Sequence, residues 1–192
     1  GYPDLLGNKL TDYVSAKASY EKLLVLNPND DDALLKYSKL LMEHFHDTIN
    51  SKKHYLKLLE IELQKENNAM MHTQIANTLK SKYRDMDGAK KQYAIALEMN
   101  PSDPAIKLEY ADFLVEHFND KTTAGKLYLK AIEMNPVDPR GYKNYAVFLH
   151  KSMNNVKSSK ENFDKALSLD PNYIIAHYGF ANLLAEGFND NK

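Results

Sequence analysis

The chain of 192 residues contains no cysteine, which excludes disulfide frameworks, thiolate metal sites and cysteine nucleophiles. Apolar runs such as residues 23–26 are far shorter than the roughly 18 residues that a membrane-spanning helix needs. Neither sign of charge is in excess, since 25 Lys and Arg stand against 26 Asp and Glu. That balance disfavours the phosphate attraction behind general nucleic-acid binding. We therefore expect neither a membrane nor a nucleic acid as partner.

Signals for secretion and for catalysis are also missing. Residues 1–12 lack the basic start and apolar run of a secretory signal, so an intracellular, cytoplasmic location is the default expectation. Glycine-rich phosphate loops, Gly-X-Ser-X-Gly elbows and HExxH motifs do not occur. His44 and His46 would lie on different sides of a helix, and residues 85–88 lack most ligands of a calcium loop. The sequence predicts no enzyme, no metal, no cofactor and no small-molecule substrate.

An internal repeat of about 35 residues is the most informative feature that is present. Asn-Pro or Asp-Pro recurs at Pro28, Pro101, Pro136 and Pro171. The last three are 35 residues apart, and Glu66 stands 35 residues before the first of them. The unit that begins at Pro28 has 38 residues, and its three extra residues follow Glu60, which predicts a longer second helix there. A fixed period of this length is typical of repeat architectures.

Each unit reads as two helices joined by a capped turn. The first residues of the units, which we call anchors, are Pro28, Glu66, Pro101, Pro136 and Pro171. Ten residues past each anchor stands a small residue: Ser38, Ala76, Ala111, Ala146, Ala181. A leucine follows three residues later: Leu41, Leu79, Leu114, Leu149, Leu184. An aromatic residue marks the second helix: Tyr20, Tyr55, Tyr93, Tyr128, Phe163. These steps have helical spacing. Between the helices a capping residue recurs, which we interpret as the N-cap of the second helix: Asp12, Asp47, Asp85, Asp120, Asn155, Asp190.

Aspartate also marks the start of the first helix in several units. Asp103-Pro104 and Asp138-Pro139 place a capping side chain ahead of proline at the first helical position, where the missing N–H does no harm. The acidic residues 30–32 have the same interpretation: a cap and favourable charges at the positive end of a helix, rather than a cation site.

In type and spacing, these residues resemble the tetratricopeptide repeat: Tyr145, Ala146, Leu149, Phe163, Ala166, Pro171. The resemblance covers nearly the whole chain. It implies an all-α fold, an α-solenoid of stacked antiparallel helical hairpins in a right-handed superhelix. Each 35-residue unit has one residue more than the family's usual 34, near the turn between its helices. The family's first aromatic is replaced throughout: Leu34, His72, Lys107, Tyr142, His177.

The repeat predicts one domain over residues 1–192, as part of a longer array. Its boundaries are a partial repeat at 1–27, repeats at about 28–65, 66–100, 101–135 and 136–170, and a partial repeat at 171–192. Leu6 and Leu10 match Leu114 and Phe118, so we expect the chain to begin within a first helix. At the other end we expect an exposed apolar strip that further repeats or a second copy would cover: Leu183, Leu184, Phe188.

The resemblance also implies a concave groove, lined by the first helix of each unit, that holds a peptide or a partner helix. By position this groove contains Lys39, Asn77, Asp112, Val147 and Asn182, with Thr73, Leu108, Lys143 and Tyr178 one turn earlier. Acidic and basic residues alternate between neighbouring units, which favours a protein partner of mixed charge: Glu109, Asp112, Glu116 against Arg140, Lys143, Lys151.

We therefore expect a non-catalytic scaffold for protein interactions. One alternative is the substrate-recruiting arm of a larger enzyme, and a less favoured one is an RNA-binding helical repeat, for which a continuous basic face would be expected. The family's clamp for the acidic C-terminal tails of chaperones is not reproduced. Asn77 and Asn182 hold its asparagine place, but Thr73 and Tyr178 stand where the clamp has lysine.

Overall fold

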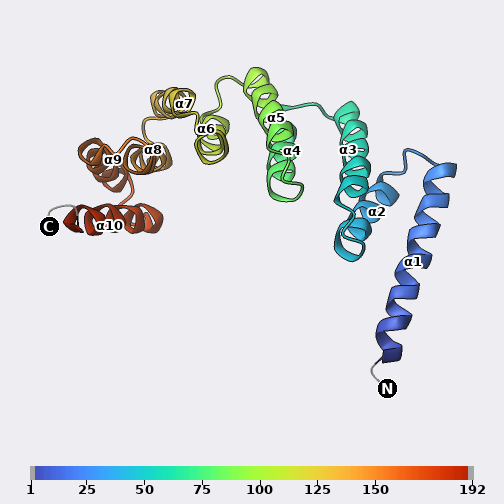
Figure 1. Ribbon diagram of the computed structural model, residues 1–192. Coiled ribbons are helices and arrows are strands. Elements are labelled where there is room, and N and C mark those ends of the chain that lie inside the picture. The colour runs from blue at the N-terminus through green and yellow to red at the C-terminus, as the bar shows by residue number, and fades with distance from the viewer. Residues whose placement is uncertain (1–2, 190–192) are drawn as a thin grey trace. The chain divides into compact units, whose positions relative to one another are not determined.

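The computed structural model describes residues 3–189, with side chains described for residues 11–186, and this part of the chain contains helices and no strand (Figure 1). The helices are α1 (Pro3–Leu26), α2 (Asp31–His44), α3 (Thr48–Lys65), α4 (Ala69–Ser81), α5 (Met86–Met99), α6 (Pro104–Phe118), α7 (Lys121–Met134), α8 (Pro139–Lys151), α9 (Val156–Leu169) and α10 (Ile174–Asn189). The predicted all-α helical-repeat solenoid is confirmed. The chain divides into two compact units, residues 1–85 and 86–192.

Within these units the helices pair in the predicted phase. Helix α2 packs on α3 in the first unit, and in the second unit α6 packs on α7 and α8 on α9. Helix α3 has 18 residues, whereas α7 and α9 have 14, which confirms the expected extension. The arrangement of all repeats as one continuous domain stays a prediction.

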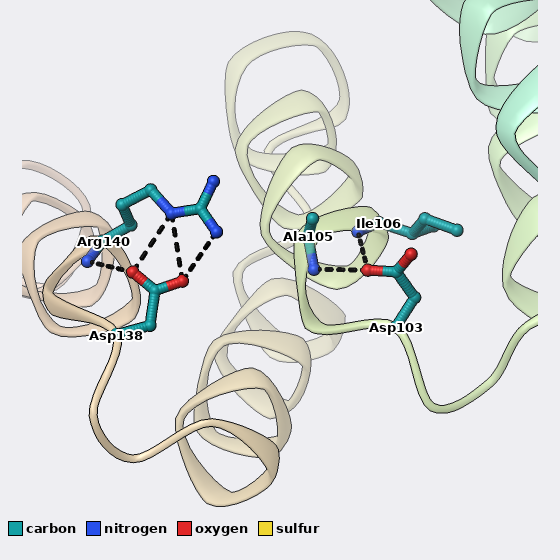
Figure 2. Close-up of polar contacts among 5 residues, drawn as sticks. All are labelled: Asp103, Ala105, Ile106, Asp138 and Arg140. Atoms are coloured by element: carbon teal, nitrogen blue, oxygen red, sulfur yellow. Dashed lines mark hydrogen bonds and ion pairs between the residues drawn. The ribbon is translucent and has the colours of Figure 1, made fainter.

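Aspartate caps begin the first helices as predicted. Asp30 accepts a hydrogen bond from the backbone N–H of Ala33 at 2.8 Å. Asp103 accepts from the backbone N–H of Ala105 at 2.8 Å and Asp138 from that of Arg140 at 2.9 Å, each directly ahead of a proline at the first helical position (Figure 2). These bonds satisfy N–H groups that have no partner within the helix.

The four connections between the first and second helices of the repeats, α2–α3, α4–α5, α6–α7 and α8–α9, share one backbone geometry. A residue with φ of 51° or 52° follows the first helix within one to three residues: His46, Arg84, Asn119, Asn154. The next residue donates its backbone N–H to a repeat leucine carbonyl six residues earlier, at 2.8–3.1 Å: Asp47 to Leu41, Asp85 to Leu79, Asp120 to Leu114, Asn155 to Leu149. Three of those residues also cap the second helix as predicted: Asp47, Asp120, Asn155. The left-handed residue lies in the turn near which the sequence predicts the extra residue of each unit.

The predicted turn at Asp12 is wrong. Helix α1 runs without a break for 24 residues, and Asp12 lies inside it instead of capping a second helix. The residue ahead of this aspartate is Thr11, where the other turns have His, Arg or Asn. A β-branched residue adopts the left-handed conformation only at considerable cost, so the helix continues. The side chains of Leu6 and Leu10 and the predicted cap at Asp190 lie outside the described residues.

Small residues allow close approach of the two helices in a hairpin. Ser38 and Ala146 on the first helices are fully buried. Opposite them, the buried Ser51 donates its hydroxyl hydrogen bond to the Ser38 carbonyl at 2.7 Å, and Ser159 donates to the Ala146 carbonyl at 2.8 Å. The repeat pattern predicted the small residue of the first helix. It did not predict the serine on the second helix that bonds to it. Each buried hydroxyl is thereby satisfied.

Aromatic rings connect each hairpin to the next helix. Tyr128 of α7 packs against Tyr145 and Phe148 of α8, with ring centroids 6.0 and 5.2 Å apart. Phe163 of α9 packs in the same way on Phe180 of α10, at 5.7 Å. The rings of Tyr128 and Phe163 are almost entirely buried, so these contacts form the core between neighbouring repeats.

At α10, the expected apolar strip is only partly present. Leu183 is 1% exposed and packs with Ala146 and Phe163, so its predicted exposure is wrong. It holds the repeat position of Phe148, which faces the preceding hairpin. Leu184 is 43% exposed as expected, and Phe188 lies outside the described side chains. Self-association through this helix stays a prediction.

Two of the residues that replace the family's first aromatic, Lys107 and His177, have a structural role. Buried Lys107 donates its ammonium hydrogen bond to the carbonyl of Pro101, and His177 Nε2 donates to that of Pro171 at 2.9 Å. Burial lowers the pKa of Lys107 below its ordinary value. Both side chains therefore tie the start of a first helix to the turn that precedes it.

Candidate functional site

Helices α6 and α8 bring most of the predicted groove residues together. They line two adjoining hollows of about 480 and 200 Å³, which share Asp112, Lys143 and Asn144. The predicted residues in their walls are Leu108, Glu109, Asp112 and Glu116 from α6 and Arg140, Lys143, Val147 and Lys151 from α8. We call this surface the α6/α8 groove. Its α6 wall is acidic and its α8 wall is basic.

Asp112 is held in place at the centre of the groove. It accepts hydrogen bonds from the hydroxyl of Tyr128 at 2.5 Å and from the side-chain amide of Asn144 at 2.9 Å. Burial raises the pKa of Tyr128, and the Asp112 charge raises it further, so the phenol stays protonated as the donor. The sequence predicted Asp112 as a groove residue and gave no sign that two side chains orient it.

The basic wall has charges in two different environments. Burial lowers the pKa of Lys143, and the opposing attraction of Asp112 is the weaker effect. Arg140 instead donates from its guanidinium to both oxygens of Asp138, and this contact lowers the pKa of the carboxyl group (Figure 2). The charge of Arg140 is thus largely engaged by a helix cap, and Lys143 is the half-buried cation of the groove.

Asn144 is the groove residue that sequence reasoning missed. It follows Lys143 directly and lies outside the positions that the family pattern assigns to the groove. Its amide nitrogen bonds Asp112, and its oxygen is buried without a hydrogen-bond partner among the described residues. A buried acceptor in this state costs roughly 1–3 kcal/mol. The only signal in the sequence is the asparagine itself.

The other predicted residues lie elsewhere. In the 1–85 unit, Lys39 is exposed on α2, Thr73 is buried on α4 and donates its hydroxyl to the Ala69 carbonyl, and Asn77 is half-buried on the same helix. In the second unit, Tyr178 is 71% exposed on α10 and Asn182 is half-buried. Neither of these two lines the α6/α8 groove.

Two kinds of site are not found in the described part of the chain. No group of three or more His, Cys, Asp or Glu side chains there could hold a metal ion. Nor does any of its helices combine the length and apolar character that crossing a membrane requires.

The sequence and the fold were compared with known proteins. Residues 144–173 match the model of the tetratricopeptide repeat family. No curated protein matches the sequence. The fold is similar to that of YrrB, described as a TPR protein with an unusual peptide-binding site, with 20% identity and a TM-score of 0.58 over 90% of this chain and 86% of that one.

Two further structures have the same fold. Pseudomonas aeruginosa PilF has 22% identity and a TM-score of 0.58, over 83% of this chain and 69% of that one. The first TPR domain of Spaghetti (RPAP3), bound to the HSP90 peptide SRMEEVD, has 16% identity and a TM-score of 0.55, over 62% of this chain and 92% of that one. At these identities the likeness shows the fold alone.

Proposed function

Because the chain is a tetratricopeptide-repeat protein, we propose that it is a non-catalytic scaffold that binds a peptide or helix of a partner protein in the α6/α8 groove. The observation that carries this proposal is the charge of the groove, whose two walls have opposite signs across shared hollows. Such walls select a partner of mixed charge and fix its register.

The groove chemistry specifies the partner further. A basic side chain fits beside Glu116 on the α6 wall, and an acidic one beside Lys143 or Lys151 on the α8 wall. An extended peptide offers the alternating side chains that such a pair of walls requires.

Reversing the groove charges tests this proposal. In the variant Glu116→Lys with Lys151→Glu, two exposed side chains exchange sign while the net charge stays the same. We expect partners bound through the groove to be captured about tenfold less than by the unmodified chain, since close charge pairs become repulsive. The measurement is quantitative mass spectrometry of affinity pull-downs.

The matched control exchanges charges away from the groove. Lys160→Glu with Glu161→Lys alters two exposed residues of α9, also without a change in net charge. Partners should stay bound to this control. If both variants lose the same partners, or neither loses any, the α6/α8 groove is not the binding surface.

A second prediction concerns chaperone tails. We expect the peptide SRMEEVD to show no submicromolar binding, because the lysine and asparagine pairs of a carboxylate clamp are incomplete. Thr73 is buried at one lysine place, Tyr178 occupies another, and Lys143 is followed one turn later by Val147. Isothermal titration calorimetry would measure this, with the Spaghetti TPR domain as positive control. Submicromolar binding of SRMEEVD by the present chain would contradict the prediction that the carboxylate clamp is incomplete.

A further inference from the structure

The 1–85 unit contains a second hollow, formed by α1, α2 and α3 and separate from the α6/α8 groove. Its volume is about 680 Å³, within the range of ligand-binding clefts. Leu24 of α1, Leu34 of α2 and Leu56 of α3 contribute apolar side chains to its lining. We call it the α1/α3 hollow.

The repeat does not impose the apolar character of this surface. Ile49 lines the hollow and is 83% exposed. At the repeat position of Ile49, helices α5, α7 and α9 have Asp87, Thr122 and Lys157, whereas at that of Leu56 helix α7 also has a leucine, Leu129. The aliphatic side chain of Ile49 is therefore specific to α3.

Positive charge surrounds the apolar lining. Lys52, Lys53 and Lys57 line the hollow against a single acidic residue, Glu60. Lys52 forms an ion pair with Asp85 at 2.5 Å. The other two lysines leave an excess of positive charge that an anionic ligand would complement.

The pKa of His54 is affected by the same lysine charges. Its ring lies 4.8 Å from that of Tyr37, and it contributes to the α1/α3 hollow and to the neighbouring hollow that contains Glu21 and Asp47. Burial lowers the pKa of His54, and Lys53 and Lys57 lower it further against the smaller opposing effect of the two acids. The charge environment here is thus net positive.

We propose that the α1/α3 hollow binds an acidic segment of a partner protein through one apolar anchor residue. The anchor would cover Ile49 and enter between Leu24 and Leu56, while flanking Asp or Glu side chains approach Lys53 and Lys57. A protein segment fits better than a free acyl chain, because the high exposure of Ile49 leaves the apolar surface open and the occupant must cover it. This site is independent of the α6/α8 groove.

The test uses a fluorescein-labelled peptide of sequence Glu-Asp-Leu-Phe-Glu-Asp and its counterpart Lys-Lys-Leu-Phe-Lys-Lys, titrated with the full chain and followed by fluorescence anisotropy. We expect the acidic peptide alone to bind. Lys53→Glu with Lys57→Glu should weaken binding about tenfold through charge reversal. Ile49→Ser should also weaken it, by about three- to tenfold, through loss of apolar contact. Ile49 and Lys53 are exposed and Lys57 is half-buried, so circular dichroism would check that each variant is folded.

The groove variant Glu116→Lys with Lys151→Glu separates this proposal from the previous one, since it should bind the acidic peptide as the unmodified chain does. The changes in backbone amide NMR shifts on addition of the acidic peptide should map to residues 24–60. Equal binding of the basic peptide, shifts confined to α6 and α8, or no binding at millimolar peptide would overturn the proposal. The proposal would also fail if laurate displaced the peptide while the Lys53→Glu with Lys57→Glu variant bound the peptide as the unmodified chain does. It would fail as well if a second copy of the chain occupied the hollow in solution.

Discussion

Tyr128→Ala is expected to lower the free energy of unfolding by about 3–5 kcal/mol, the usual effect of deleting a buried aromatic side chain. Tyr128 is 2% exposed, and its ring packs against Tyr145 and Phe148 of the next helix. The substitution leaves a cavity between two repeats and removes the hydrogen bond to Asp112. Urea denaturation followed by circular dichroism would measure the loss.

The variant Tyr128→Phe divides this effect into its two parts. It retains the ring and deletes the hydroxyl that donates to Asp112, so we expect a loss of only about 1–2 kcal/mol. If alanine and phenylalanine destabilise the protein equally, the ring contacts between α7 and α8 contribute little, and the account of the core given above is wrong.

Gly179→Ala is expected to destabilise the protein by up to about 2 kcal/mol, although alanine ordinarily favours helices over glycine. A Cβ at this position would lie 2.8 and 2.9 Å from two ring atoms of Phe163. That ring is buried and stacked on Phe180, so it cannot move away freely. Overpacking of about 1–3 kcal/mol therefore exceeds the gain of about 1 kcal/mol in helix propensity.

Gly125→Ala is the matched control for this prediction. In α7 the nearest atom to an added Cβ is a ring carbon of Phe148 at 3.5 Å, an ordinary contact. We expect this exchange to raise stability by up to about 1 kcal/mol, because only the propensity difference remains. Thermal unfolding of both variants would test the pair, and a stabilised Gly179→Ala would contradict the packing of α9 against α10.

The sequence predicted the parts of the fold that depend on local, repeated signals. Caps such as Asp103 and Asp138 act within a few residues of themselves, so their positions could be read directly from the chain. The added length of α3 followed from counting residues between anchors. Leu183 was misjudged because helical periodicity gives the side chains that share a face without giving the neighbour that covers it.

The candidate site was predicted less completely, for a different reason. The repeat pattern places Asp112 and Lys143 on the same surface, but a hydrogen bond such as that from Asn144 to Asp112 joins residues 32 positions apart. Only the packing of α6 against α8 makes it possible. The α1/α3 hollow is harder still to foresee, because residues that depart from the repeat, such as Ile49, give it its character.

The uninterrupted course of α1 has a consequence for how arrays of this kind are divided into rigid segments. An Asp or Asn recurs at the turn position of each repeat, yet in the described chain the left-handed turn forms after His, Arg or Asn and does not form at Thr11. Thr11 is β-branched and disfavours that conformation, so the residues on both sides of it form a single helix. A count of the recurring Asp or Asn residues therefore overestimates the number of helical hairpins in the described chain.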